Sequence, residues 1–100
     1  MAVQLHTYFA DSDGHPIDPY TAVAFDKPIS LRKATIITAA GGARVELYDG
    51  TADTDPLLFA AEFSGLATAN PKWSEDDLPF KTACYVKIAS GAAEVFLYSK

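Results

Sequence analysis

The fold is decided by residues 84–98, which read CYVKIASGAAEVFLY. Apolar and polar residues alternate on both sides of Ser90-Gly91, and a period of two is typical of a β-strand with one buried face. Because Ser-Gly fits a two-residue hairpin turn, the stretch predicts two strands joined by that turn. In this register Lys87 faces Glu94, an opposite-charge pair that favours the alignment.

The same register gives the predicted hairpin two apolar faces. The inner face carries small and aliphatic side chains, namely Cys84, Val86, Ile88, Val95 and Leu97. The outer face carries aromatic side chains, and Tyr48 is expected to share their orientation on its own strand. Since such a face needs a cover, we expect another copy of the chain or a loop to bury it. The interface candidates are Tyr48, Trp73, Tyr85, Phe96 and Tyr98.

A second hairpin is predicted at Gly41-Gly42, with Ile36 opposite Leu47. Similar alternation places about seven strands along the chain, near residues 3–9, 20–25, 30–39, 43–49, 57–63, 82–89 and 92–98. Turn-forming residues predict loops over 10–19 and 64–79. The pattern indicates an all-β fold, a single small antiparallel β-sandwich of the jelly-roll-like or immunoglobulin-like kind.

Composition favours one globular domain, with residues 1–28 as an N-terminal arm that includes strands and 29–100 as the β-sandwich core. The chain has 100 residues, of which 49% are hydrophobic and 21% charged, so it can bury a core. A net charge of −5 disfavours nucleic acid and anionic membranes as partners. The N-terminal sequence is unlike a signal peptide, and no apolar run has the ~20 residues of a membrane span. We therefore expect synthesis in the cytoplasm and no secretion by a signal peptide.

Signatures of catalysis are sparse. The single cysteine, Cys84, lies in a strand pattern far in sequence from His6 and His15, and the motifs of serine hydrolases, zinc proteases and dithiol sites do not occur. Acidic residues cluster within 11–18, 49–55 and 75–77, and we interpret them as solvated turn residues because the complete calcium-loop pattern is missing. We predict no catalytic residue, no metal and no cofactor. A Cys84-dependent enzyme is the enzymatic alternative.

Several segments also follow one another in a familiar order. They are VELYDGT at 45–51, LLF at 57–59, LPF at 78–80, CYV at 84–86 and AEVFLY at 93–98. This order, over about residues 30–98, resembles the small β-sandwich virion proteins of tailed bacteriophages and prophages. In that group a YDGT turn follows a strand of alternating apolar residues, and the chain closes with a hairpin ending in tyrosine.

The resemblance implies a structural role in the virion and no reaction. It implies a capsid decoration (cement) protein, assembled in the host cytoplasm as a homo-oligomer, with a homotrimer favoured, and bound to the major capsid protein or another virion protein. The segments 1–28 and 64–79 depart from the group's pattern and are expected to make contacts. The alternatives are a tail, neck or baseplate component and a carbohydrate- or protein-binding β module.

Overall fold

The computed structural model describes residues 4–10, 23–73 and 77–99. These residues form seven strands in one antiparallel sheet, which are β1 (Gln4–Ala10), β2 (Val23–Phe25), β3 (Ile29–Asp49), β4 (Leu57–Phe63), β5 (Thr68–Ala69), β6 (Leu78–Phe80) and β7 (Cys84–Ser99). The prediction of an all-β, antiparallel fold is confirmed. The described strands belong to one continuous sheet, so they do not divide into the two sheets of a sandwich. None of the described residues form a helix suited to crossing a membrane.

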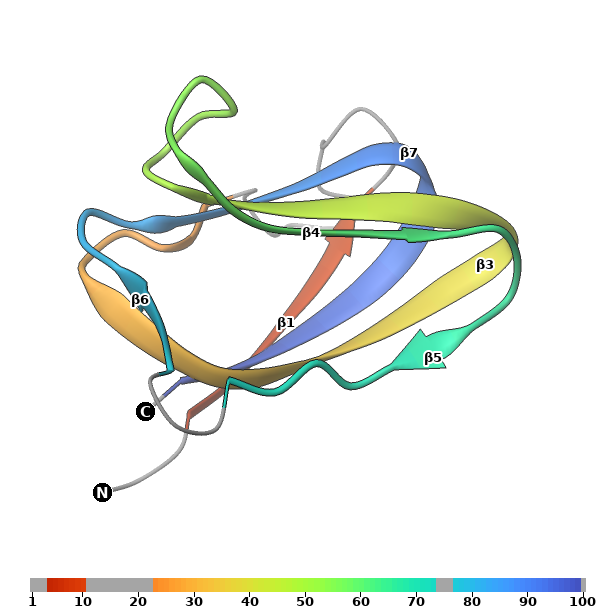
Figure 1. Ribbon diagram of the computed structural model, residues 1–100, viewed down its shortest axis with the longest axis horizontal. Helices are drawn as coiled ribbons and strands as arrows, with labels where there is room; N and C mark the ends of the chain where they lie inside the picture. The colour runs from red at the N-terminus through yellow and green to blue at the C-terminus, as the bar shows by residue number, and fades with distance from the viewer. Residues whose placement is uncertain (1–3, 11–22, 74–76, 100) are drawn as a thin grey trace.

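Two long strands dominate this sheet. β3 and β7 form an antiparallel ribbon that bends back on itself, running along the bottom of Figure 1, turning at the right and returning along the top. We call residues 31–38 of β3 and 93–99 of β7 the lower arm. Residues 43–49 of β3 and 84–91 of β7 form the upper arm. The two arms face each other across the core.

The two predicted hairpins are wrong. Ser90-Gly91 lies inside β7 and Gly41-Gly42 lies inside β3, so neither pair ends a strand. Instead, the register between the two strands shifts at this point, with Ala43 opposite Gly91. The glycines mark a corner at which both strands bend together. The backbone there has φ values of 78° at Gly42 and 71° at Gly91, which glycine adopts at little cost.

The predicted strand partners change with the hairpins. Lys87 lies opposite Glu46 rather than Glu94, and Ile36 lies opposite Val95 rather than Leu47. The physical reason is that alternation specifies which face of a strand is buried but leaves its partner open. A ribbon bent at its middle buries the same faces as two separate hairpins.

The core lies between the two arms. The predicted inner face is confirmed, since its residues, Cys84, Val86, Ile88, Val95 and Leu97, are at most 1% exposed. Val45 and Leu47 of β3 are buried with them. Phe25 and Phe80 add two buried rings, from β2 and β6. Fully burying one such aliphatic or aromatic side chain stabilises the fold by roughly 1.5–3 kcal/mol.

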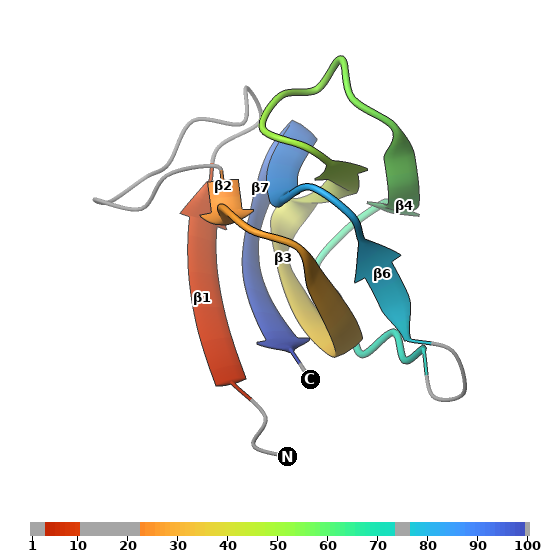
Figure 2. The same cartoon turned by 90° about the vertical axis from the view of Figure 1, so that its left-hand side faces the viewer.

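Short strands extend both arms sideways. β4 pairs with the upper part of β3, whereas β5 and β6 pair with its lower part. On the opposite side β1 and β2, from the N-terminal segment in which strands are predicted near 3–9 and 20–25, pair with β7 (Figure 2). The strand predicted over 57–63 is confirmed. The loop predicted over 64–79 is partly wrong, because it contains β5 and the start of β6, and the loop predicted over 10–19 lies, from residue 11, outside the described residues.

Candidate functional site

The candidate aromatic residues lie on two different surfaces. Because alternate residues of β3 and β7 are buried between the arms, the residues between them point away from the core. Tyr48 and Tyr85 therefore lie on the outer face of the upper arm, and Phe96 and Tyr98 on the outer face of the lower arm. The expectation that all four share one face is wrong, since the bend turns the two outer faces in opposite directions.

Trp73, the fifth candidate, packs against the core. Its ring meets that of Phe59 edge-on, with the centroids 5.2 Å apart and the planes at 88°. Edge-to-face contacts of this kind add ~0.5–1.5 kcal/mol to the effect of burial. The structure thus gives Trp73 a packing role at the boundary between β4 and the segment that follows β5.

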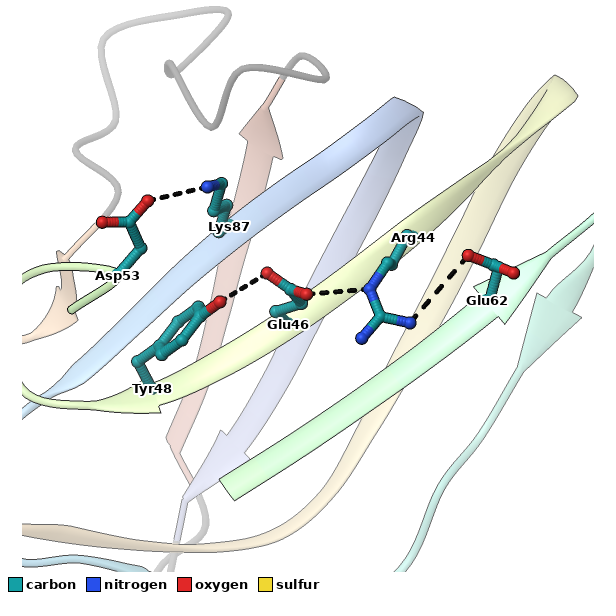
Figure 3. A network of polar contacts seen from close by, with 6 residues as sticks. All are labelled: Arg44, Glu46, Tyr48, Asp53, Glu62 and Lys87. Atoms are coloured by element: carbon teal, nitrogen blue, oxygen red, sulfur yellow. Dashed lines mark hydrogen bonds and ion pairs between the residues drawn. The ribbon is translucent and has the colours of Figure 1, made fainter. Parts of the chain in front are cut away.

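The outer face of the upper arm carries a closed polar network (Figure 3). The Tyr48 hydroxyl donates a hydrogen bond to Glu46 Oε1 at 2.5 Å, and Arg44 Nε donates to Glu46 Oε2 at 2.8 Å. Arg44 also reaches Glu62 at 3.9 Å. Tyr48 packs edge-on against Tyr85, at 6.1 Å between ring centroids. Glu46 and Tyr48 are 8% and 9% exposed, so little of either side chain is open to a ligand.

This network shifts the ionisation of its members. Burial acts to raise the pKa of Glu46, but the hydrogen bonds from Tyr48 and Arg44 outweigh it, and the pKa lies below its usual range. The same bond to Glu46, together with burial, raises the pKa of Tyr48. Both shifts stabilise an ionised carboxylate beside a protonated phenol. At neutral pH the Tyr48–Glu46 pair therefore stabilises the fold and is not set up to exchange protons.

The acidic residues of the 49–55 turn are also engaged in structural contacts. Asp53 Oδ2 accepts a hydrogen bond from Lys87 Nζ at 2.7 Å, which joins the turn to β7. Asp49 accepts from the Thr82 amide at 2.8 Å. Asp55 accepts from the amides of residues 51 and 52 at 3.0 and 3.2 Å. Within the part of the chain that the structure describes, no three acidic, histidine or cysteine side chains gather as a metal site.

Cys84 is poorly placed for nucleophilic chemistry. Its side chain is 0% exposed, and burial, with a smaller effect of Asp49, raises the pKa of the thiol to about 12. A thiolate is the reactive form of cysteine, so this thiol is inert at neutral pH. Of the two histidines, His6 lies in β1, where only the backbone is described, and His15 lies outside the described residues. The geometry thus speaks against a Cys84-dependent enzyme.

The outer face of the lower arm is partly exposed to solvent. Along β3 it presents Ile37, Thr35 and Lys33, which lie opposite Glu94, Phe96 and Tyr98 of β7. Ile37 is 36% exposed, and both aromatic residues are partly exposed. Lys33 Nζ lies 4.6 Å from the centroid of the Tyr98 ring, within range of a cation–π contact.

An apolar groove opens at the edge between the arms. It has a volume of about 340 Å³ and is lined by Ile36, Phe59, Ala61, Phe63, Ala69, Asn70 and Pro71. These residues come from β3, β4, β5 and the segment that follows β5. Sequence reasoning missed the groove because it needs β5 to be recognised as a strand, and two residues give no periodic signal.

Comparison with known proteins adds no relative. No protein family matches the sequence, and neither the curated proteins nor the solved structures provide a match.

Proposed function

We propose that this chain is a non-enzymatic structural protein of a tailed-bacteriophage particle, a capsid decoration protein that docks on the head surface as a homo-oligomer, with a homotrimer favoured. The observation that carries the docking role is the open outer face of the lower arm. There Ile37, Phe96 and Tyr98 form a partly exposed apolar strip. Exposed apolar surface of this kind marks contacts between proteins.

The polar chemistry of the chain supports docking over catalysis. Glu46 is held on both carboxylate oxygens, Asp53 is paired with Lys87, and the Cys84 thiol is buried. Throughout the described residues, every buried side-chain nitrogen or oxygen has a hydrogen-bond partner. Groups that are satisfied in this way stabilise the fold.

The assignment to a particle depends on the resemblance of residues 30–98 to small β-sandwich virion proteins. The folded ribbon agrees with it, because two arms that pack face to face over one core are sandwich-like even within a single sheet. An acidic chain whose one thiol is buried also suits a protein made in the cytoplasm and later exposed outside the cell.

Binding to purified particles tests the proposal. Heads of the phage or prophage whose genome carries the coding sequence are mixed with increasing amounts of the chain and sedimented, and light scattering gives the mass of the free protein. We expect saturable binding to heads and an oligomer three times the mass of the chain. A chain that stays monomeric at every concentration and does not sediment with particles would contradict the proposal.

A further inference from the structure

A bulge in β3 turns two neighbouring cations away from the core. The register of β3 against β7 shifts between Leu31 and Lys33, so that Arg32 is the extra residue. Leu31 and Ala34 are 0% and 1% exposed, whereas Arg32 and Lys33, between them, are both exposed. In a regular strand one of these two side chains would point into the core, and a bulge is the usual device for redirecting it.

A third cation comes from outside the long strands. Lys72 lies directly opposite Lys33 in an antiparallel bridge. This bridge is fixed by two backbone hydrogen bonds, from the Trp73 amide to the Arg32 carbonyl at 2.9 Å and from the Ala34 amide to the carbonyl of residue 71 at 3.0 Å. Like charges directly opposite each other weaken a strand pair. The fold therefore holds Lys33 and Lys72 together at a cost.

The ion pairs of the described residues do not include these three cations and are formed by Arg44 and Lys87. Three of the eight basic residues of a chain with net charge −5 thus gather at one end of the lower arm. We call Arg32, Lys33, Lys72 and Tyr98 the cationic face.

The cationic face continues into the apolar strip of the lower arm. Lys33 reaches over the Tyr98 ring, and the neighbouring row holds Phe96 opposite Thr35. The Thr35 hydroxyl is hydrogen-bonded to Asn70 Oδ1 at 2.8 Å, so the segment that bears Lys72 is joined to this row. A partner that covers this surface therefore contacts a cluster of positive charges and the apolar strip side by side.

We propose that the cationic face is a docking site for an acidic surface of a partner protein, with the partner's carboxylates contacting Lys33 and Lys72 and an apolar group covering Phe96. This inference rests on the proposed docking function and specifies the chemistry of the partner. Carboxylates placed here convert a repulsive pair into two attractive contacts. A nucleic acid fits less well, because the chain's net charge of −5 repels a phosphate backbone.

A peptide titration tests the chemistry of the site without any particle. The probe is a short peptide of alternating glutamate and valine, whose carboxylates lie on one face when it is extended. Its counterpart of alternating lysine and valine is the control. We expect only the acidic peptide to shift the amide NMR signals of Lys33, Lys72 and Tyr98, with an affinity that falls as salt is added. Equal shifts with both peptides, or shifts elsewhere alone, would overturn the proposal.

Charge reversal separates a docking role from a structural one. Lys72→Glu should weaken binding of the acidic peptide by about tenfold. It should also raise the thermal midpoint of the chain, because a Glu–Lys pair replaces a Lys–Lys pair. The matched control is Lys27→Glu, an exposed lysine outside the cationic face that gives the same change in net charge. We expect the control to keep most of the affinity.

Three results of the variant experiment would overturn the proposal. They are unchanged peptide affinity in Lys72→Glu, a fall in its thermal midpoint, and tighter binding of a single-stranded DNA oligonucleotide than of the acidic peptide to the parent chain at the same salt. The last result would assign the face to nucleic acid. Because the titration uses no particle, its failure leaves the particle test of the proposed function open, and failed particle binding leaves the titration valid.

Discussion

Gly91 and Gly42 touch at the corner where the β3–β7 ribbon bends, so closely that a Cβ atom on Gly91 would lie 1.9 Å from the Gly42 carbonyl oxygen. Both residues have positive φ, at 71° and 78°. The corner therefore requires glycine for two reasons, backbone conformation and space. It is also the feature that turns one long ribbon into two facing arms.

Gly91→Ala should destabilise the chain by about 2 kcal/mol or more, since the new methyl group is strained by the backbone and meets Gly42. Gly41→Ala is the matched control, because nothing lies within 4 Å of a Cβ built there. Its effect should stay within about 1 kcal/mol. Urea unfolding of both variants measures the difference. Equal losses of stability would indicate two ordinary hairpin turns in place of a shared corner.

The 49–55 turn provides a specific electrostatic partner for Lys87. A double-mutant cycle between Lys87 and Asp53 should show a small favourable coupling that decreases with salt, as expected of a partly exposed ion pair. The same cycle between Lys87 and Glu94 should show none, because Glu94 lies on the lower arm opposite Ile37. Coupling to Glu94 in place of Asp53 would support a hairpin at Ser90-Gly91 and contradict the ribbon.

The Tyr48–Glu46 bond makes stability depend on pH. The pKa of Glu46 in the fold lies below its unfolded value of ~4.3, so its contribution is present above that pH and is lost as pH falls through the folded-state pKa. Tyr48→Phe should cost about 1–2 kcal/mol at pH 7 and should lose less stability on acidification than the parent. Urea unfolding at neutral and acidic pH measures both values. Parallel pH profiles for the two proteins would show that the bond contributes little.

Cys84 should be unreactive in the folded chain. With the pKa of the thiol raised to about 12 by burial, a disulfide reagent at neutral pH should modify it only after unfolding. The measurement is the rate at which the reagent's coloured thiol product is released, with and without denaturant. Fast modification of the native protein would restore Cys84 as a candidate nucleophile.

The two outer faces predict different effects of aromatic truncation. Phe96→Ala should weaken binding of the chain to purified heads, since a central interface aromatic commonly contributes ~2 kcal/mol or more. Tyr85→Ala, on the outer face of the upper arm, should leave that binding intact. Co-sedimentation with heads gives both results, with circular dichroism to check the fold. If Phe96→Ala unfolds the protein, the residue belongs to the core and the assignment fails.

Alternation in the sequence was sufficient to predict which residues are buried. Val86, Ile88, Val95 and Leu97 were expected inside and lie there. Their strand partners could not be predicted, because a glycine pair is compatible with either a hairpin turn or a bend inside a strand. A corner that involves both strands is a long-range property, and local turn chemistry carries no information about it.

The cationic face could not be predicted from the sequence for the same reason. Arg32 and Lys33 are adjacent, and regular alternation would place them on opposite sides of the strand. Only the bulge brings both outward, and Lys72 joins them through a bridge in a segment whose composition predicts a loop. The division of Tyr48 from Phe96 onto opposite faces likewise follows from the bend.

Docking on a particle through the outer face of the lower arm should cover the aromatic residues of that face. Hydroxyl-radical footprinting of the free chain and of the chain bound to purified heads measures this, because tyrosine and phenylalanine side chains report their own exposure. Phe96 and Tyr98 should become protected on binding while Tyr85, on the opposite face, keeps its reactivity. Protection of Tyr85 with no change at Phe96 and Tyr98 would contradict docking through this face.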